Sequence, residues 1–314
     1  MQIVSLITVT SPDFRPVMLR FLNFLILAAS LAGCASSKFV FVESENFDER
    51  IRHIVIHYTS ENFEESLRLL TQRTSYPVSS HYLIPEKDDP TYLPATLKVY
   101  SLVRERDRAW HAGRSSWFGQ SDLNFSSIGI ELVNRSGCDK PIQEMSSLSE
   151  FSKNCQFREF DDRQIKLLIR LLKGILYRYP NIDPINIMGH SDIAPSRKVD
   201  PGPTFPWRRL HEEGLGVWYD DDDYQYFIER LRNNRPNIAN MQKLLGELGY
   251  RLDVTGVEDL RSQSVVRAFQ MRFRDGAYSG FLDLETEAII YALHKKYIQT
   301  SFEKFGGDTL INGY

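Results

Sequence analysis

The chain has 314 residues, of which 42% are hydrophobic and 25% are charged, and its formal net charge is −3. This composition suits a globular protein with one sizeable core and a small second domain. Because the net charge is slightly negative and no long basic stripe is present, nucleic acid is not expected as a partner. Three cysteines are too few for a disulfide-rich scaffold.

The N-terminus has the pattern of a secretory signal. Arg15 and Arg20 precede an apolar stretch over residues 21–31, which ends in Leu31-Ala32-Gly33-Cys34. A basic start, a short apolar run and small residues before a break are typical of such signals, whereas a membrane span needs ~20 residues. We expect a signal peptide over residues 1–34, starting at Met1 or Met18, and a tether over residues 35–50.

The end of this signal resembles the bacterial lipobox, whose cysteine becomes the acylated first residue of the mature protein. The resemblance implies a lipid anchor at Cys34. Because Ala35 follows where an aspartate would imply retention at the inner membrane, it further implies an outer-membrane lipoprotein facing the periplasm. The alternative is an ordinary signal peptide that contains a cysteine.

Strands and helices alternate over residues 51–215. Residues 51–59 alternate as a strand does, and Ser60 can cap a following helix that carries Phe63, Leu67 and Leu70 at helical spacing. Further strands are predicted over 80–84, 98–103 and 127–133, a long amphipathic helix from 161 to the break at 180, and a short strand over 185–188. This alternation favours an α/β domain.

Two cysteines lie in a polar, serine-rich insertion within this domain. If the chain is exported, the periplasm permits a disulfide between Cys138 and Cys155. Such a bridge would contribute about 3 kcal/mol on the loop-closure argument. Two free thiols are the alternative.

The last hundred residues have a different pattern. Residues 216–236 are acidic, aromatic and finally rich in Asn and Pro, which is typical of a linker with some helix. Three short helices are predicted over 237–299, forming a small all-α domain, followed by a tail over 300–314. We expect this accessory module to affect access to substrate and not the chemistry.

Three candidate metal ligands lie at or near the ends of predicted strands. His57 lies near the end of the first strand, His190 follows a later one, and Asp200 lies in the next loop. Zinc enzymes commonly use three protein ligands and leave the fourth position to water. By themselves, two histidines and an aspartate are a weak signal, since a lone strand histidine is more often structural.

Five motifs in order give the sequence a more specific meaning. They are Ile56-His57-Tyr58-Thr59, residues 79–84 (SSHYLI), residues 109–113 (AWHAG), residues 127–132 (SIGIEL) and residues 189–203 (GHSDIAPSRKVDPGP). Together they resemble the type 2 N-acetylmuramoyl-L-alanine amidases, over about residues 50–210. That family shares its fold, a central mixed sheet flanked by helices, with T7-type lysozyme and the peptidoglycan recognition proteins.

The resemblance implies hydrolysis of the amide between N-acetylmuramic acid and L-alanine in peptidoglycan or muropeptides, for cell-wall turnover. It implies one zinc ion per chain on the three ligands above, with Glu131 as general base and Lys198 stabilising the oxyanion. Trp110 and His111 are implied to contact substrate at the rim of the cleft. Tyr82 is assigned to substrate as well, although packing is an alternative for it.

The segment 237–299 resembles the small peptidoglycan-binding domain of wall hydrolases, through features such as Gln242, Gly249-Tyr250 and residues 264–270 (SVVRAFQ). Two readings compete with an amidase: a non-catalytic peptidoglycan-binding lipoprotein of the same fold, and a structural lipoprotein that ties the outer membrane to the wall. The residues leave open the preference for anhydro or ordinary muramic acid, the stem peptide, the oligomeric state and regulation.

Overall fold

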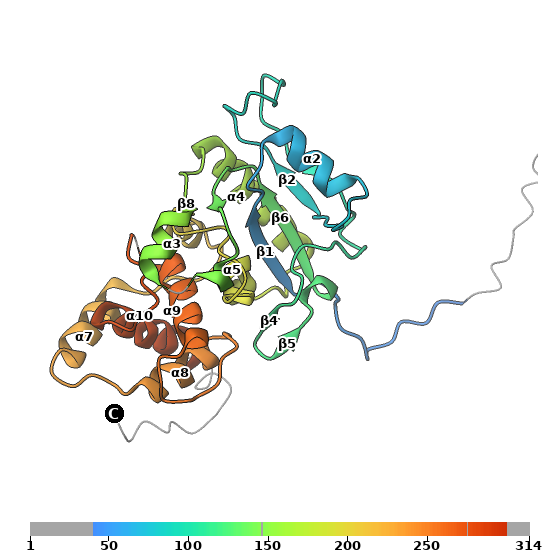
Figure 1. The fold of residues 1–314 in the computed structure, drawn as a ribbon. Coiled ribbons are helices and arrows are strands. Elements are labelled where there is room, and N and C mark those ends of the chain that lie inside the picture. Colours follow the sequence, from blue (N-terminus) through green and yellow to red (C-terminus); the bar gives the residue numbers. More distant parts are fainter. Residues whose placement is uncertain (1–39, 146, 275, 300–314) are drawn as a thin grey trace, which may run out of the picture. The chain divides into compact units, whose positions relative to one another are not determined.

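The computed structural model describes residues 40–145, 147–274 and 276–299 (Figure 1). Residues 1–48 and 49–314 form two separate units, and the described part of the first, residues 40–48, is exposed. Cys34 and the predicted signal lie outside the described residues. Among the helices that are described, none combines the length and the hydropathy needed to cross a bilayer.

The second unit is built on a five-stranded mixed sheet, as the resemblance implies. The strands lie in the order β3-β2-β6-β1-β9. Strand β1 is parallel to both of its neighbours, β6 and β9, β2 is parallel to β6, and β3 is antiparallel to β2. The strands span His53–Tyr58 (β1), Tyr82–Ile84 (β2), Tyr100–Ser101 (β3), Ser127–Leu132 (β6) and Ile187–Gly189 (β9).

Both faces of the sheet are buried. All six residues of β1 are buried, which agrees with its run of isoleucine, valine and histidine, because a parallel strand needs cover on each side. The long helix α4 (Asp162–Arg178) supplies part of that cover with the predicted apolar stripe. Asp161 caps its first turn, and the helix ends before Pro180, which disfavours helical backbone in the residue ahead of it.

Several predicted boundaries were wrong, among them the strand predicted over residues 185–188, which spans Ile187–Gly189 after a 3₁₀ helix at 184–186. Helix α2 spans Phe63–Thr71 and is capped by Asn62, whose side chain accepts a hydrogen bond from the Glu65 backbone N–H. Ser60, the predicted cap, instead lies in a turn with φ of +62°. The strand predicted over residues 98–103 is only Tyr100–Ser101, because β3 is an edge strand that pairs with β2 alone.

Several short elements carried no clear sequence signal. They are the hairpin strands β4 (Ser116–Trp117) and β5 (Gln120–Ser121), the pair β7 (Gly137–Cys138) and β8 (Cys155–Gln156), and the helices α3 (Leu148–Asn154), α5 (His190–Ile193) and α6 (Trp207–Glu212). A disulfide joins Cys138 to Cys155 across the second strand pair. Short 3₁₀ helices lie at 123–125, 142–144 and 184–186, and a π-helical turn at 295–299.

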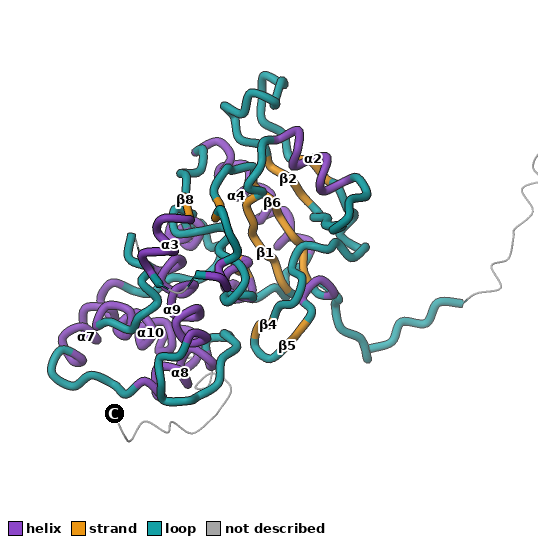
Figure 2. The backbone as a smooth tube through the Cα atoms, in the orientation of Figure 1, coloured by secondary structure: helices purple, strands orange, loops and turns teal. Residues whose placement is uncertain are grey.

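The C-terminal part is helical, as predicted. Its helices are α7 (Asp221–Leu231), α8 (Ile238–Glu247), α9 (Leu260–Phe273) and α10 (Leu284–His294), gathered in one region of Figure 2. Helix α7 belongs to the segment predicted as a linker. It packs on α10, with the rings of Phe227 and Tyr291 stacked at 5.3 Å.

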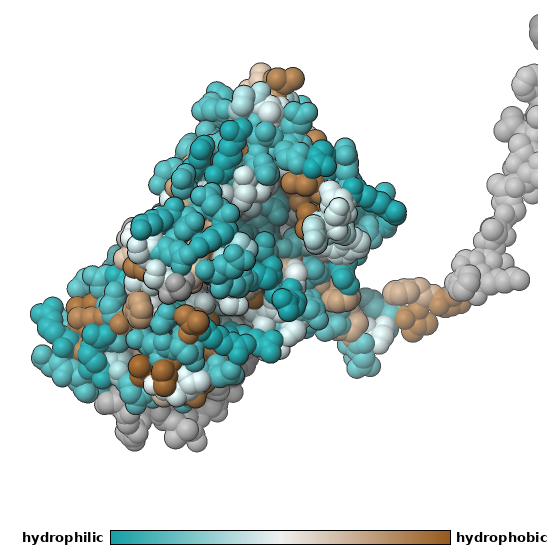
Figure 3. Space-filling view, viewed as in Figure 1, coloured by the Kyte–Doolittle hydropathy of each residue, from teal (hydrophilic) through white to brown (hydrophobic). Residues whose placement is uncertain are grey.

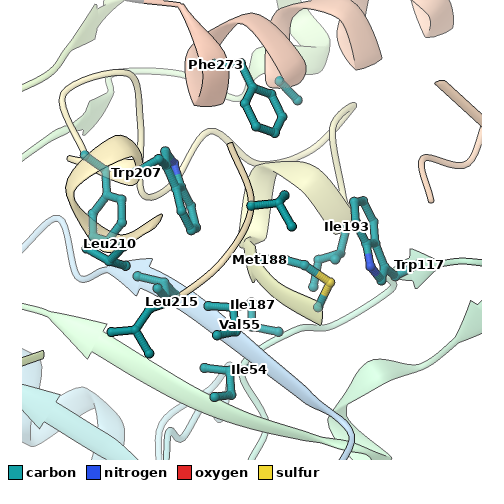
Figure 4. Packing of buried hydrophobic residues seen from close by; sticks show 14 of the residues in the cluster. Ile54, Val55, Trp117, Ile187, Met188, Ile193, Trp207, Leu210, Leu215 and Phe273 are labelled. Atoms are coloured by element: carbon teal, nitrogen blue, oxygen red, sulfur yellow. The ribbon is translucent and has the colours of Figure 1, made fainter. Parts of the chain in front are cut away.

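This helical part shares a core with the sheet domain. Figure 4 shows Phe273 of α9 close to Trp207 of α6, above the layer formed by β1 and β9. On another side, the Phe118 N–H donates to the Gly249 carbonyl, and the Trp117 ring contacts the Tyr250 ring. Gly249 has φ of +105°, and a Cβ there would lie 2.9 Å from the Trp117 ring. The two parts are therefore closely packed, not joined by a linker alone.

The face of the molecule in Figure 3 shows few large apolar areas. On the face that Figure 3 shows, residues are mostly hydrophilic, with apolar ones in small separate groups. Small scattered groups are usual on soluble surfaces and mark no particular contact site. The site must be found from side-chain chemistry.

Candidate active site

The sheet places the three predicted ligands together. Strands β1 and β9 are parallel neighbours in which Ile56 pairs with Gly189, so the next residues, His57 and His190, lie at the same level. Helix α5 begins at His190, and the Ser191 N–H donates to the carbonyl of Asp200 at 2.8 Å. The strand register and the first turn of α5 thus bring residues more than a hundred positions apart into one site.

The ligand atoms converge closely. His57 Nδ1 lies 3.0 Å from His190 Nδ1 and 2.9 Å from Asp200 Oδ2, and His190 Nδ1 lies 3.1 Å from the same oxygen. All three side chains are buried. They form the one group of three or more such side chains, within the described parts of the chain, that could hold a metal ion.

Hydrogen bonds assign a lone pair to Nδ1 of His190. Its Nε2 lies 3.0 Å from the Ala112 carbonyl, which can only accept, so Nε2 carries the hydrogen. Arg197 does not compete, because its Nη2 already donates to the carbonyls of Ala112 and Arg114. Burial lowers the pKa of His190 to about 4, so the ring is neutral near pH 7 and Nδ1 faces the site without a hydrogen.

A longer chain of hydrogen bonds leaves the Nδ1 atom of His57 with a lone pair as well. The Ser127 hydroxyl donates to the Leu123 carbonyl at 2.6 Å, so it must accept from His111 Nε2 at 3.2 Å. Burial, and then the neighbouring histidines, hold the pKa of His111 well below its ordinary value, so this ring is neutral. Its Nδ1 therefore accepts from His57 Nε2 at 3.0 Å. His57 Nδ1 is left with its lone pair toward the other two ligand atoms.

Asp200 completes a set of three acceptors. Its side chain is buried, and Oδ2 faces the Nδ1 atoms of both imidazoles. Three acceptor atoms about 3 Å apart, with no hydrogen between them, repel one another unless a cation lies among them. The donor set therefore fits a divalent metal ion that accepts nitrogen and oxygen ligands.

Glu131 lies beside this group on the neighbouring strand. It pairs with His57 in the register of β1 and β6, and its Oε2 is buried with no hydrogen-bond partner among the described residues. Burial raises its pKa to about 7. A carboxyl group with a pKa near 7 can both accept and return a proton at neutral pH.

A cleft of about 510 Å³ opens over these groups. It is lined by the three ligands, Glu131 and Lys198, and by Trp110 and His111. The segment 137–142, which the disulfide ties to β8, and residues of α2 also line it. The predicted ligands, base and cation therefore share one cavity.

Two predicted substrate contacts are placed differently from expectation. Tyr82 is not among the cleft-lining residues that the structure describes, and its hydroxyl donates to Glu105, a partner of Arg178 on α4. His111 lines the cleft but is only 8% exposed, with both ring nitrogens hydrogen-bonded inside the protein. Trp110, in contrast, is 49% exposed at the rim.

Sequence reasoning missed Ser127, whose hydroxyl accepts from His111, and Arg197, whose guanidinium donates to the Ala112 carbonyl that also accepts from His190. Both lie inside motifs of the resemblance, so their position in the sequence was the available signal.

Comparison with known proteins agrees with this site. Residues 47–203 match the N-acetylmuramoyl-L-alanine amidase family Amidase_2. The chain is 40% identical to N-acetylmuramoyl-L-alanine amidase AmiD of Escherichia coli over 296 residues, which cover 90% of this chain and all of that protein. A putative N-acetylmuramoyl-L-alanine amidase of Rickettsia conorii is 29% identical over 71% of this chain and 75% of its own length.

Solved structures agree in fold. AmpDh3 from Pseudomonas aeruginosa, solved with anhydromuramic pentapeptide, is 40% identical with a TM-score of 0.74, over 84% of this chain and 99% of that one. AmiD from E. coli, solved with the substrate anhydro-N-acetylmuramic acid-L-Ala-D-gamma-Glu-L-Lys, is 37% identical with a TM-score of 0.68, over 82% and 93% of the two chains. The chain belongs to the N-acetylmuramoyl-L-alanine amidase family and is an enzyme of that activity.

Proposed function

We propose that the chain hydrolyses the amide between N-acetylmuramic acid and L-alanine with one zinc ion held by His57, His190 and Asp200. The observation that carries the proposal is the convergence of two imidazole lone pairs and a carboxylate in a cleft beside an unpartnered carboxyl group. When bound, zinc supplies a water of lowered pKa and polarises the scissile carbonyl.

The chain's own residues would move the protons and stabilise charge. Glu131 accepts a proton from the attacking water and returns it to the nitrogen of the leaving L-alanine, so the carboxylate is regenerated at the end of the cycle. The Lys198 ammonium lies at the same cleft and stabilises negative charge that develops on the carbonyl oxygen. Trp110 offers an exposed ring at the rim for the sugar.

The substrate class follows from the relatives. Since AmpDh3 and AmiD have been solved with anhydromuramic ligands, we propose that muropeptides ending in 1,6-anhydromuramic acid are substrates here, with a role in wall recycling. Incubation with anhydro and ordinary muropeptides, followed by product analysis, tests this. If the protein cleaves neither kind of muropeptide, the proposed activity is wrong, and the non-catalytic peptidoglycan-binding alternative is favoured.

The metal assignment has a direct test. His57→Ala and Asp200→Ala should lose zinc and activity together, because two remaining ligands hold the ion poorly against water. Metal analysis of purified variants measures this. Normal zinc content in either variant would contradict the assignment.

We also propose that the protein is a lipoprotein at the periplasmic face of the outer membrane, acylated at Cys34. The lipobox-like sequence supports this, and the Cys138–Cys155 disulfide is compatible with an oxidising compartment. A Cys34→Ser variant should leave the membrane fraction while the purified enzyme stays active. Continued membrane association of that variant would contradict the anchor.

A further inference from the structure

The C-terminal helical part places two buried side chains against the short helix that begins with His190. Arg272 of α9 donates to Asp192 Oδ2 at 2.6 Å and to the Ile187 carbonyl at 3.0 Å. The Tyr250 hydroxyl donates to the other oxygen of Asp192 at 2.7 Å. We call Arg272, Tyr250 and Asp192 the brace.

The brace surrounds the candidate ligand His190 in the sequence. Ile187 comes three residues before it, in the edge strand β9, and Asp192 comes two residues after it, in α5. One guanidinium therefore binds the chain on both sides of the ligand. Asp192 also accepts from the Gly189 backbone N–H at 2.8 Å, which closes the first turn of α5 on itself.

The brace reaches a second ligand through the backbone. The Ser191 N–H, between His190 and Asp192, donates to the carbonyl of Asp200 at 2.8 Å. A shift of α5 would thus move two of the three ligand-bearing residues together. His57 belongs to β1 and would stay in place, so the ligand atoms would separate.

The interaction is strong enough to act as a support. Asp192 and Arg272 are 1% and 4% exposed, and the guanidinium lies 4.3 Å from the centre of the Trp207 ring. Charge-assisted hydrogen bonds away from water are stronger than neutral ones, and removing one partner leaves a buried charge uncompensated. Tyr250 is buried as well, packed on Trp117.

From this geometry we propose that Arg272 and Tyr250 are positioning residues of the metal site: the C-terminal part holds α5 in the place where His190 and Asp200 bind the ion. The inference rests on the proposed zinc function. It gives the C-terminal part a role in assembling the site, in addition to any role in wall binding.

The test is zinc affinity, measured on the full-length protein by competition with a chelator. Tyr250→Phe keeps the ring and loses only the hydroxyl, and Arg272→Met keeps much of the buried volume and loses the guanidinium. Both should remain folded and bind zinc about 10- to 100-fold more weakly, the range for losing an outer support of a metal ligand. The absorption spectrum of the cobalt-substituted protein should change too, because the ligand geometry changes.

Arg274→Met is the matched control. Arg274 lies two residues further along and binds Asp283 and Thr286 inside the C-terminal part, without touching α5. This variant should lose stability but keep native zinc affinity and the native cobalt spectrum.

If folded Tyr250→Phe has native zinc affinity and an unchanged cobalt spectrum, the proposed positioning role of the brace is wrong, while the proposed function is unaffected. If Arg272→Met does not fold, the Tyr250→Phe result decides. If the unmodified protein binds no zinc, the proposed zinc function itself fails. Losses of equal size in Arg274→Met would also overturn the brace, since they would reflect stability alone.

Discussion

Glu131 owes its chemistry to its surroundings. In the sequence it is the one charged residue of strand β6, and the fold buries its Oε2 beside His57 without a hydrogen-bond donor among the described residues. This oxygen, which has no hydrogen-bond partner among the described residues, is available to substrate and water. Removing it should therefore affect turnover more than stability.

Glu131→Gln tests this directly. The amide has nearly the same shape but cannot accept the proton, so turnover on a muropeptide should fall about 10²- to 10⁴-fold, the range for a general base. Zinc content and melting temperature should stay close to native values. Near-native turnover would show that Glu131 is only structural.

The acid limb of the pH–rate profile gives a second residue-level prediction. Burial raises the pKa of Glu131 to about 7 in the metal-free protein. Bound zinc adds positive charge, which favours the carboxylate and lowers this pKa. The rate should therefore fall as the pH drops, because the protonated acid cannot act as a base, with a midpoint at or below about 7. The profile of the zinc-loaded enzyme measures this, and a midpoint clearly above 7 would contradict the role.

At the residue scale, the sequence predicted the candidate metal ligands better than the residues that hold them in position. His57, His190 and Asp200 were identifiable because ligand residue types lie at strand ends and inside ordered motifs. Arg272 was not, since it is 80 residues from Asp192 and their contact depends on how two helices pack. Its place between Phe269 and Phe273 was the one signal, and a weak one, because the same helix also carries Arg261 and Arg267.

At the scale of the strand, one glycine makes room for the hydrogen-bond chain that orients His57. Gly129 lies in β6, and a Cβ built there would be 2.4 Å from the His111 ring. A Cβ atom essentially never comes this close to another heavy atom, so something must move. Even the smallest side chain at this position should therefore displace His111.

Gly129→Ala should lower the free energy of unfolding by about 1–3 kcal/mol, the usual range for overpacking, and should also weaken zinc binding. Gly174→Ala is the matched control, because its Cβ would only make an ordinary 3.5 Å contact with Arg178 in helix α4. Thermal unfolding and chelator competition on both variants measure the difference. Equal zinc affinities would show that His111 does not orient the ligand.

Elements with strong periodicity were predicted well, and short ones were not. Helix α4 and strands β1 and β6 have long apolar patterns that fix their position. Strands of two residues, such as β4 and β7, have too few positions to form a pattern. Their place is set by a hairpin turn and by the disulfide, which depend on the folded chain.

For the whole molecule, the shared core changes the expectation for a truncated protein. From the sequence, deletion of residues 237–314 was expected to spare the cleavage of small muropeptides. The structure shows that this segment supplies Arg272, Tyr250 and Phe273 to the core beneath the site. Deletion should therefore lower the melting temperature, weaken zinc binding and reduce cleavage of small soluble substrates. Native activity in a truncated enzyme would show that the sheet domain is self-sufficient.

The contact that Arg272 of α9 makes with strand β9 has a consequence for solubility. Strand β9 is an edge of the sheet, and the carbonyl of its Ile187 accepts a hydrogen bond from the Arg272 side chain. Unpaired edges are templates for pairing between chains, and proteins commonly cover them. A variant that has lost the Arg272 contact would present the carbonyls of β9 to other copies of the protein. Its self-association should therefore increase with protein concentration. The helices that support the metal site would then also be what keeps the enzyme from aggregating through its own sheet.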